Sequence, residues 1–267
     1  MKKLCKFISI IIIVFAFSVT AFPQKYLKKI QERNELRVGM TAKQPPFAIK
    51  TQEGKIIGYE AELAEMLANA MGVNLKIVEI PFTDLLNSLE DGKVDMVMSG
   101  MTMTIKRNMK TIFVGPHLLS GKSILFRSDF FSNTDEPQDL NNKNVNIVAL
   151  KGSNSEIFVK KEIPNAVLTL ALDYEEGIKM LEENKVQIML ADYPICAYTA
   201  LIHPEKGLYT IDQPLTIEPI GVALPVDAAH FQNLVENFIG VLSLDGTLAE
   251  MQSYWFDSGE WIDQVKP

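Results

Sequence analysis

A twelve-residue segment occurs twice in this chain in similar form. LEDGKVDMVMSG, over residues 89–100, is matched by LEENKVQIMLAD, over residues 181–192. Each copy completes a helical pattern, turns at Gly92 or Asn184, and enters an apolar run that suits a buried strand. Helix, turn and strand units share such features in general, so chance is the alternative explanation. Taken as a repeat, the segment predicts two related α/β lobes.

The rest of the chain supports the same fold class. Apolar runs alternate with helical patterns, which is typical of an α/β fold with mixed, mostly parallel sheets flanked by helices. The clearest helix lies between Gly58 and Gly72, where apolar residues recur at helical spacing after an acidic first turn. The polar stretch 128–144 is predicted to be a loop. Strands are predicted over 36–40, 75–80, 96–99, 145–150 and 188–191, and helices over 83–91, 153–162, 174–183 and 194–202.

The first 21 residues have the order of a secretory signal: a basic start, an apolar run, and small residues before a cleavage site. An uncleaved anchor is the alternative, but the run is shorter than the ~20 residues that a spanning helix needs. Cleavage would remove three lysines and leave 246 residues with 23 basic and 33 acidic side chains, a net charge of −10. This charge argues against nucleic acid as a partner. Cys196 would be the one remaining cysteine, and we expect it to be buried and inert.

Ligands of open α/β sheets bind beyond the carboxyl ends of the strands, and often between lobes. Gly100 follows the first strand of the repeat, and Thr102, the helix cap Thr104 and Arg107 come after it. Glycine permits close approach of the backbone, and a guanidinium binds a carboxylate with two parallel hydrogen bonds. This segment is a candidate carboxylate receptor. An ordinary surface arginine is the alternative.

The second copy of the repeat ends at Asp192, which could accept hydrogen bonds from a ligand ammonium. Capping the helix that begins near Pro194 is the competing structural role, and its two oxygens could serve both. Ser153 and Asn154 form another polar turn before a helix, although no phosphate-binding loop pattern is present. Phe82 is either a core residue or an apolar wall. We expect no metal, cofactor or catalytic triad, because the three histidines are dispersed and the usual motifs are lacking.

Four segments then indicate a family: LRVGMTAKQPPF, GKIIGYEAELAEMLANAMGV, GKVDMVMSGMTMTIKR and FVGPHLLSGKSILF. In this order they resemble the amino-acid-type extracellular solute-binding proteins of ABC transporters, family 3, which have the type II periplasmic binding fold. The resemblance implies two lobes joined by two hinge strands, with a first lobe of 22–121 and 214–267 and a second lobe of 122–213. It also implies a monomer that serves a membrane permease from the periplasm.

The resemblance assigns roles to the candidate residues. Gly100, Thr102 and Arg107 match positions that hold a ligand α-carboxylate, Ser153 and Asn154 match a second polar contact, Asp192 matches the acid for the α-ammonium, and Phe82 matches an aromatic wall. Gln44 replaces a frequent aromatic residue and Thr41 an acid of basic-amino-acid binders, which argues against a lysine- or arginine-type ligand. His117 often appears as tyrosine, and we expect it to be structural.

Two other functions stay open on this scaffold. Some relatives are dehydratases of prephenate- or arogenate-like substrates, for which Glu218 or Glu156 would have to act as a general acid of raised pKa. A non-transport sensor of small ligands is the second alternative.

Overall fold

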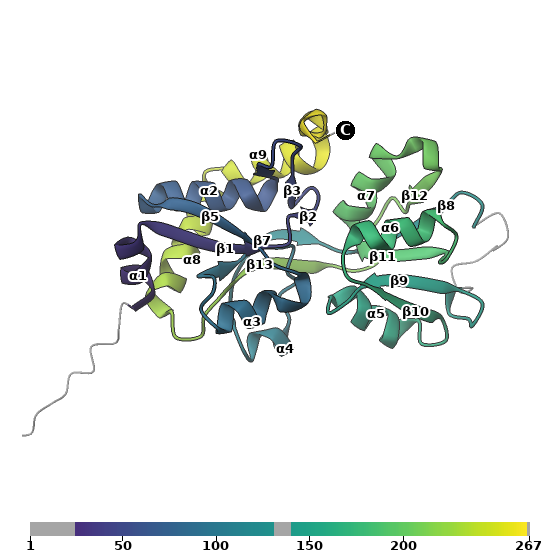
Figure 1. The fold of residues 1–267 in the computed structure, drawn as a ribbon, viewed down its shortest axis with the longest axis horizontal. Coiled ribbons are helices and arrows are strands. Elements are labelled where there is room, and N and C mark those ends of the chain that lie inside the picture. Colours follow the sequence, from purple (N-terminus) through teal and green to yellow (C-terminus); the bar gives the residue numbers. More distant parts are fainter. Residues whose placement is uncertain (1–24, 131–139, 266–267) are drawn as a thin grey trace, which may run out of the picture.

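The computed structural model describes residues 25–130 and 140–265, which form two α/β lobes side by side (Figure 1). The predicted signal at residues 1–21 and part of the predicted loop at 128–144 lie outside the described residues. No described helix is long and apolar enough to cross a bilayer. The helices are α1 (Lys25–Arg33), α2 (Tyr59–Met71), α3 (Leu85–Glu90), α4 (Ile105–Asn108), α5 (Asn154–Glu162), α6 (Tyr174–Glu182), α7 (Tyr193–Ile202), α8 (Ala229–Leu244) and α9 (Thr247–Gln252).

The strands build one five-stranded sheet in each lobe. The first-lobe sheet has the order β5-β1-β6-β13-β7 and the second-lobe sheet the order β10-β9-β11-β8-β12, while β2, β3 and β4 form a small third sheet. The strands are β1 (Glu35–Met40), β2 (Lys43–Gln44), β3 (Ala48–Lys50), β4 (Ile56–Ile57), β5 (Asn74–Glu79), β6 (Met96–Val97), β7 (Ile112–Ser120), β8 (Lys122–Arg127), β9 (Asn146–Leu150), β10 (Val167–Ala171), β11 (Ile188–Asp192), β12 (Leu208–Thr210) and β13 (Glu218–Leu224).

Both sheets are mixed, as the sequence predicts. Parallel pairing joins β1 to β5 and β6, and joins β9 to β10 and β11. The remaining neighbours are antiparallel: β13 with β6 and β7, and β8 with β11 and β12. Two of the four strand pairs in each sheet are therefore antiparallel, so the sheets are mixed as predicted but not mostly parallel. The antiparallel pairs involve the strands at which the chain passes between the lobes: β7 is the last strand before the second lobe, β8 is the first strand of the second lobe, and β13 is the first strand after the chain re-enters the first lobe.

The repeated segment has the same geometry in both lobes. β6 and β11 each occupy the central position of their sheet. The turns before them carry left-handed residues, Gly92 with φ 69° and Asn184 with φ 58°. The amide of Lys93 donates to Ser88 O at 2.9 Å, and that of Lys185 donates to Met180 O at 2.9 Å. The two segments are therefore structural equivalents, and the carboxyl ends of β6 and β11 occupy equivalent positions in the two sheets.

Helices cover both faces of each sheet and bury its apolar side chains. In the first lobe α2 packs on β5 and β1, and α8 packs on β7. In the second lobe α5 and α6 pack on β9, while α7 packs on β8 and β12. Cys196 lies on α7 and is fully buried, as predicted. Burial raises the pKa of its thiol well above the ordinary value, which keeps it protonated and inert.

The two lobes are connected by closely packed strands. The amide of Leu215 donates to Lys122 O at 2.7 Å, and the amide of Lys122 donates to Thr216 Oγ1 at 2.9 Å. Between them, a Cβ added to Gly121 would lie 2.0 Å from Thr216 O and 2.6 Å from Pro214 Cβ. Only glycine fits between the connecting segments at this point.

Candidate functional site

The loop after β6 begins at Gly100, whose backbone is fixed from behind. Its amide donates to Glu60 Oε2 at 2.7 Å, and Glu60 is fully buried on α2. Glu60 Oε1 lies 3.2 Å from His117 Nε2 on β7. Both of these atoms, and His117 Nδ1, lack an aligned hydrogen bond among the described residues. His117 is thus buried within the fold, but in the described part of the chain neither of its ring nitrogens has the hydrogen-bond partner expected of a structural histidine. The Gly100 amide serves the fold and is not free for a ligand.

Arg107 extends from the short helix α4 toward the second lobe. Thr104 caps this helix as predicted, since its Oγ1 accepts from the Arg107 amide at 3.3 Å. The guanidinium then bridges the lobes: Nη1 donates to Thr102 O at 2.8 Å, and Nη2 donates to Gly152 O at 3.2 Å. A guanidinium has five N–H donors, so donors remain for a carboxylate.

Phe82 forms the floor beneath this guanidinium. It is buried at the start of a 3₁₀ turn, and Arg107 Cζ lies 5.7 Å from the centre of its ring. The ring face attracts the cation. Burial lowers the pKa of Arg107, and the nearby negative charges of Asp192 and Glu218 oppose that shift. The carboxylates of Asp192 and Glu218 are therefore near enough to Arg107 to influence the pKa of its guanidinium.

Asp192 ends β11 at the N-cap position of α7, but its side chain does not cap the helix. Its Oδ1 accepts instead from Lys122 Nζ at 2.6 Å. The antiparallel register of β8 and β11 places these two residues directly opposite each other. Lys122 is 1% exposed and Asp192 is 5% exposed, so the ion pair is almost completely shielded from solvent. The competing capping role of the side chain is therefore not observed, and Oδ2 accepts no hydrogen bond from the described residues.

Glu218 is a fourth charged group, in addition to Arg107, Asp192 and Lys122. It begins β13, is 6% exposed, and lies 3.8 Å from Lys122 Nζ through its Oε2. Asn154 Nδ2 donates to the same oxygen at 2.6 Å. We call Arg107, Lys122, Asp192 and Glu218 the charge cluster. It contains two positive and two negative groups, contributed by both lobes and by the strand that connects them.

An uncharged polar group of side chains lies beside the charge cluster. Gln44 is buried, and its Oε1 accepts from Thr41 Oγ1 at 2.8 Å and from the Ser99 hydroxyl. Tyr174, at the start of α6 in the other lobe, lies close to the Gln44 side chain. Burial raises the pKa of Tyr174 well above its ordinary value, and the neighbouring Asp192 raises it further, so the phenol stays neutral.

The polar turn before α5 is built as a helix start. Ser153 is the N-cap of α5, with its Oγ accepting from the Glu156 amide at 3.2 Å. Its hydroxyl is thus engaged in capping, while Asn154 reaches the charge cluster through Glu218. Gly152 contributes its carbonyl to Arg107.

The structure therefore brings most of the predicted site residues together and adds others. Arg107 contacts both Thr102 and Phe82. Asn154 bonds to Glu218 and Asp192 bonds to Lys122 within the charge cluster. Gly100 and Ser153 are engaged elsewhere. Sequence reasoning did not select Lys122 and assigned Glu218 only a tentative role. A lysine at the head of the apolar run KSILF was the available signal, because a charge in a buried strand requires a partner.

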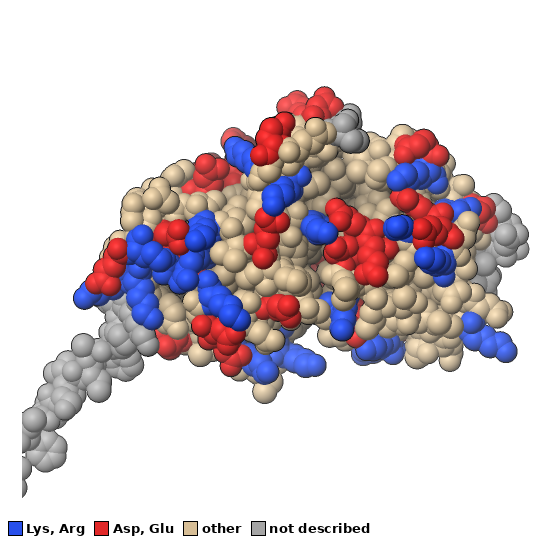
Figure 2. Space-filling view, viewed as in Figure 1, with Lys and Arg blue, Asp and Glu red and all other residues tan. Residues whose placement is uncertain are grey.

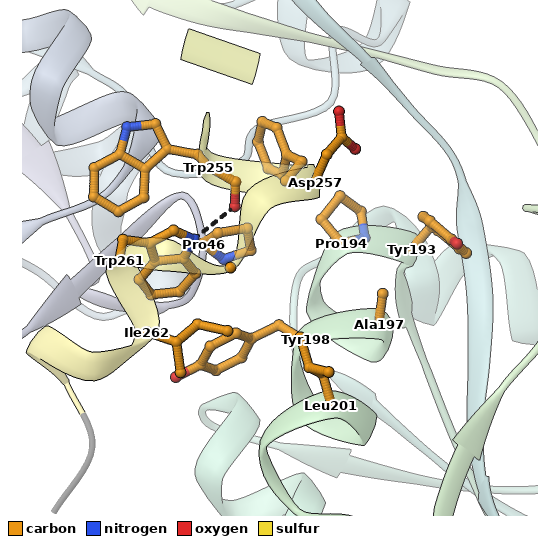
Figure 3. A pocket seen from close by; sticks show the side chains of 12 residues that line it. Pro46, Tyr193, Pro194, Ala197, Tyr198, Leu201, Trp255, Asp257, Trp261 and Ile262 are labelled. Carbon is orange, nitrogen blue, oxygen red and sulfur yellow. Dashed lines mark hydrogen bonds between the residues drawn. The ribbon is translucent and has the colours of Figure 1, made fainter. Parts of the chain in front are cut away.

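A second contact between the lobes lies near the chain's C-terminal end. Tyr198 on α7 stacks on Trp261, with ring centroids 5.1 Å apart and planes 17° apart. Trp261 is held in the first lobe because its Nε1 donates to Trp255 O at 2.9 Å (Figure 3). Beside the stack lies a cavity of about 140 Å³. Its lining comes from both lobes and includes Pro46, Pro194, Ala197 and Leu201 (Figure 3).

Charged side chains also meet across the surface between the lobes. Lys43 Nζ lies 2.9 Å from Asp173 Oδ2 and 2.9 Å from Glu175 Oε2. Figure 2 shows basic and acidic side chains intermixed over this face, with no single sign dominating. No group of three or more potential metal ligands occurs among residues 25–130 and 140–265.

Comparison with known proteins is consistent with this geometry. The sequence profile of the bacterial extracellular solute-binding proteins, family 3, matches residues 36–258. The chain is 25% identical to the L-cystine-binding protein TcyJ of Escherichia coli, covering 91% of each chain. It is 23% identical to cyclohexadienyl dehydratase of Pseudomonas aeruginosa, covering 86% of each.

Solved structures show the same fold. A binding component of an ABC transporter from Wolinella succinogenes, complexed with lysine, superposes with a TM-score of 0.81 at 29% identity, over 86% of this chain and 99% of that one. The ancestral amino acid-binding protein AncCDT-1, a precursor of cyclohexadienyl dehydratase, superposes with a TM-score of 0.80 at 30% identity, with the same coverage. The expected type II periplasmic binding fold is thereby confirmed.

Proposed function

The chain belongs to the bacterial extracellular solute-binding proteins of family 3, and on that premise we propose that it captures a small amino-acid-like ligand by hinge closure. In this proposal it works outside the cytoplasm as a monomer and delivers the ligand to the membrane permease of an ABC transporter. The single observation that carries the proposal is the charge cluster, in which the Arg107 guanidinium of the first lobe reaches Gly152 O of the second lobe and Asp192 ends β11 of that second lobe.

The proposed hinge lies where the two connecting segments pack together. Residues 22–121 and 214–267 form the first lobe, and residues 122–213 form the second. The tight contact of Gly121 with Pro214 and Thr216 supports this boundary. It shows that the two connecting segments lie directly against each other there, with no room for a side chain at position 121. Bending beyond this point would move α7 and Asp192 relative to Arg107 as a body.

The α-carboxylate and the α-ammonium of an amino acid match the hydrogen-bonding positions of the charge cluster that the described side chains leave open. An α-carboxylate would bind the donors that Arg107 does not use for Thr102 and Gly152, while Phe82 supports the guanidinium. An α-ammonium would donate to Asp192 Oδ2. Asn154 would add a polar contact from the second lobe. Because a zwitterion meets both charges only when the lobes are together, its binding favours the closed form.

Calorimetry on the chain without residues 1–21 tests this function. We expect micromolar or tighter binding of at least one α-amino acid, and loss of binding in Arg107→Ala. Arg127→Ala is the matched control, because that arginine pairs with Asp129 on the far part of the second lobe. Asp192→Asn should weaken ligands with a free ammonium far more than their deaminated analogues. Equal affinity in Arg107→Ala and the wild type would refute the carboxylate assignment.

A second candidate function is dehydration of a prephenate-like substrate. The observation that favours it is Glu218, a buried carboxyl 3.8 Å from the Lys122 ammonium, a cation that could hold a substrate carboxylate. In such a dehydration the ring carboxylate leaves as carbon dioxide, its bonding electrons complete the aromatic ring, and an acid protonates the hydroxyl so that it departs as water when the C–O bond breaks. Glu156 is unsuited to this role. Burial alone would raise its pKa, but hydrogen bonds from Lys160 and from the Gly152 amide lower it overall.

An assay for loss of prephenate separates the two functions. If the chain is a dehydratase, turnover occurs in the wild type and disappears in Glu218→Gln, while the conversion persists in Glu156→Gln. If it is a binding protein, prephenate is stable in its presence and amino-acid binding is retained. The calorimetric and chemical measurements can be made on the same preparation.

A further inference from the structure

We propose that Lys122 makes the cleft selective for an amino acid with an uncharged side chain. The inference rests on the proposed function and narrows its ligand class. It differs from what the solved relatives suggest, since one of them is complexed with lysine and another is an ancestral arginine-binding protein bound to arginine.

The first step is the charge of the cleft before any ligand enters. Lys122 and Arg107 contribute two positive charges, and Asp192 and Glu218 contribute two negative charges. Lys122 touches both acids, at 2.6 Å from Asp192 Oδ1 and 3.8 Å from Glu218 Oε2. The side chains of these three residues are at most 8% exposed. Solvent therefore screens the interactions among Lys122, Asp192 and Glu218 only weakly, while Arg107 is half-buried.

The second step is what each class of ligand adds. A zwitterion with an uncharged side chain brings one carboxylate for Arg107 and one ammonium for Asp192. The net charge of the cluster and its ligand therefore stays at zero. A lysine- or arginine-type ligand brings an additional cation, and the ammonium of Lys122 already occupies the acids that would receive it. A glutamate-type ligand brings an additional anion next to Glu218. Burying an unpaired charge is strongly unfavourable.

The neighbouring side chains offer no further counter-charge. Thr41, Gln44 and Ser99 are uncharged and hydrogen-bond to one another, and burial keeps the phenol of the neighbouring Tyr174 neutral. Lys43, Asp173 and Glu175 lie at the exposed rim, where pairing in water contributes little. The buried pair of Glu60 and His117 sits behind the Gly100 loop and contacts each other. Lys122 is thus the group that sets the charge which the cleft accepts.

The test uses calorimetry with glutamine, arginine and glutamate as probes, on four forms of the chain without residues 1–21. The wild type should bind glutamine at least tenfold more tightly than arginine or glutamate. Lys122→Met leaves one excess negative charge and should shift the arginine-to-glutamine affinity ratio toward arginine by tenfold or more. Glu218→Gln leaves one excess positive charge and should shift the glutamate-to-glutamine ratio toward glutamate by a similar factor.

The double variant Lys122→Met with Glu218→Gln restores a balanced cleft, and it also guards against misfolding of the single variants. It should bind glutamine in preference to both charged probes. Tighter binding of arginine than glutamine by the wild type, or unchanged ratios in a folded Lys122→Met protein, would overturn the inference while leaving amino-acid binding intact. If no form binds any amino acid, the proposed function itself fails.

Discussion

Removal of the Tyr198 ring should weaken ligand binding although the ring does not belong to the charge cluster. Tyr198 stacks on Trp261 across the boundary between the lobes, at 5.1 Å between ring centroids. If the lobes separate on opening, this contact exists only in the closed form. A ligand that requires the closed form then has its affinity multiplied by the fraction of molecules that can close.

The size of the effect follows from the contact. A stacked aromatic pair contributes about 0.5–1.5 kcal/mol beyond the area that it buries. Since about 1.4 kcal/mol corresponds to a factor of ten in an equilibrium constant, Tyr198→Ala should raise the dissociation constant by roughly 2- to 12-fold. Calorimetry measures the constant directly. Trp255 and Trp261 are the two tryptophans of the sequence and both lie in this segment, so intrinsic fluorescence reports closure.

A matched control is available in the second lobe. Tyr209 stacks on Phe126, with centroids 6.4 Å apart, and both residues belong to the β8–β12 pair. Tyr209→Ala removes a comparable ring contact without touching the boundary between the lobes, so it should leave the dissociation constant unchanged. Equal affinities for Tyr198→Ala and Tyr209→Ala would refute the idea that the stack contributes to closure.

Three further predictions concern the frame of the site. In the chain without residues 1–21, Cys196 should not react with a thiol reagent at pH 8 until denaturant is added, because burial raises its thiol pKa; rapid reaction of the native protein would contradict this. Gly121→Ala should lower the melting temperature sharply through its clash with Thr216 O, whereas Gly240→Ala, with no atom within 4 Å of the new Cβ, should raise it slightly. Burial would raise the pKa of Asp173, but hydrogen bonds from the Glu176 amide and Lys43 lower it overall. The ionised Asp173 therefore stabilises the fold fully at pH values above its ordinary pKa of about 3.9, and this stabilisation is lost as the pH falls through the lowered pKa. In acid unfolding, Lys43→Met should lose less stability than the wild type within that pH window. Superimposable stability profiles of the two proteins would exclude a contribution from the Lys43–Asp173 pair.

The sequence predicted those parts of the fold that depend on local patterns. The helix between Gly58 and Gly72 and the cap at Thr104 were found because spacing and capping chemistry act within one turn. The repeat identified equivalent strands, although β6 is only two residues long, where a strand to residue 99 was expected. Ser99 leaves the ladder because its hydroxyl bonds to Gln44 and Thr41.

The charge cluster could not be predicted in the same way. Asp192 is opposite Lys122 because β8 runs antiparallel to β11, and the two residues are 70 positions apart in the chain. Periodicity gives no information about such a register. Reading Asp192 as a helix cap was reasonable on local grounds, and it failed because a buried ammonium competes for the same carboxylate.

The distribution of contacts indicates how the cleft combines rigidity with motion. Within the lobes, the groups that would bind a ligand are fixed independently of closure: Arg107 by Thr102 O, and Asp192 by Lys122. Between the lobes the same groups make few bonds, chiefly Arg107 to Gly152 O at 3.2 Å and Asn154 to Glu218 at 2.6 Å. In the proposed function each half is therefore preorganised, and a ligand would contribute mainly by joining the halves. Substitutions within a lobe should then lower affinity by displacing a binding group, whereas Asn154→Ala should lower it by favouring the open form, with a matching loss of the fluorescence change on closure.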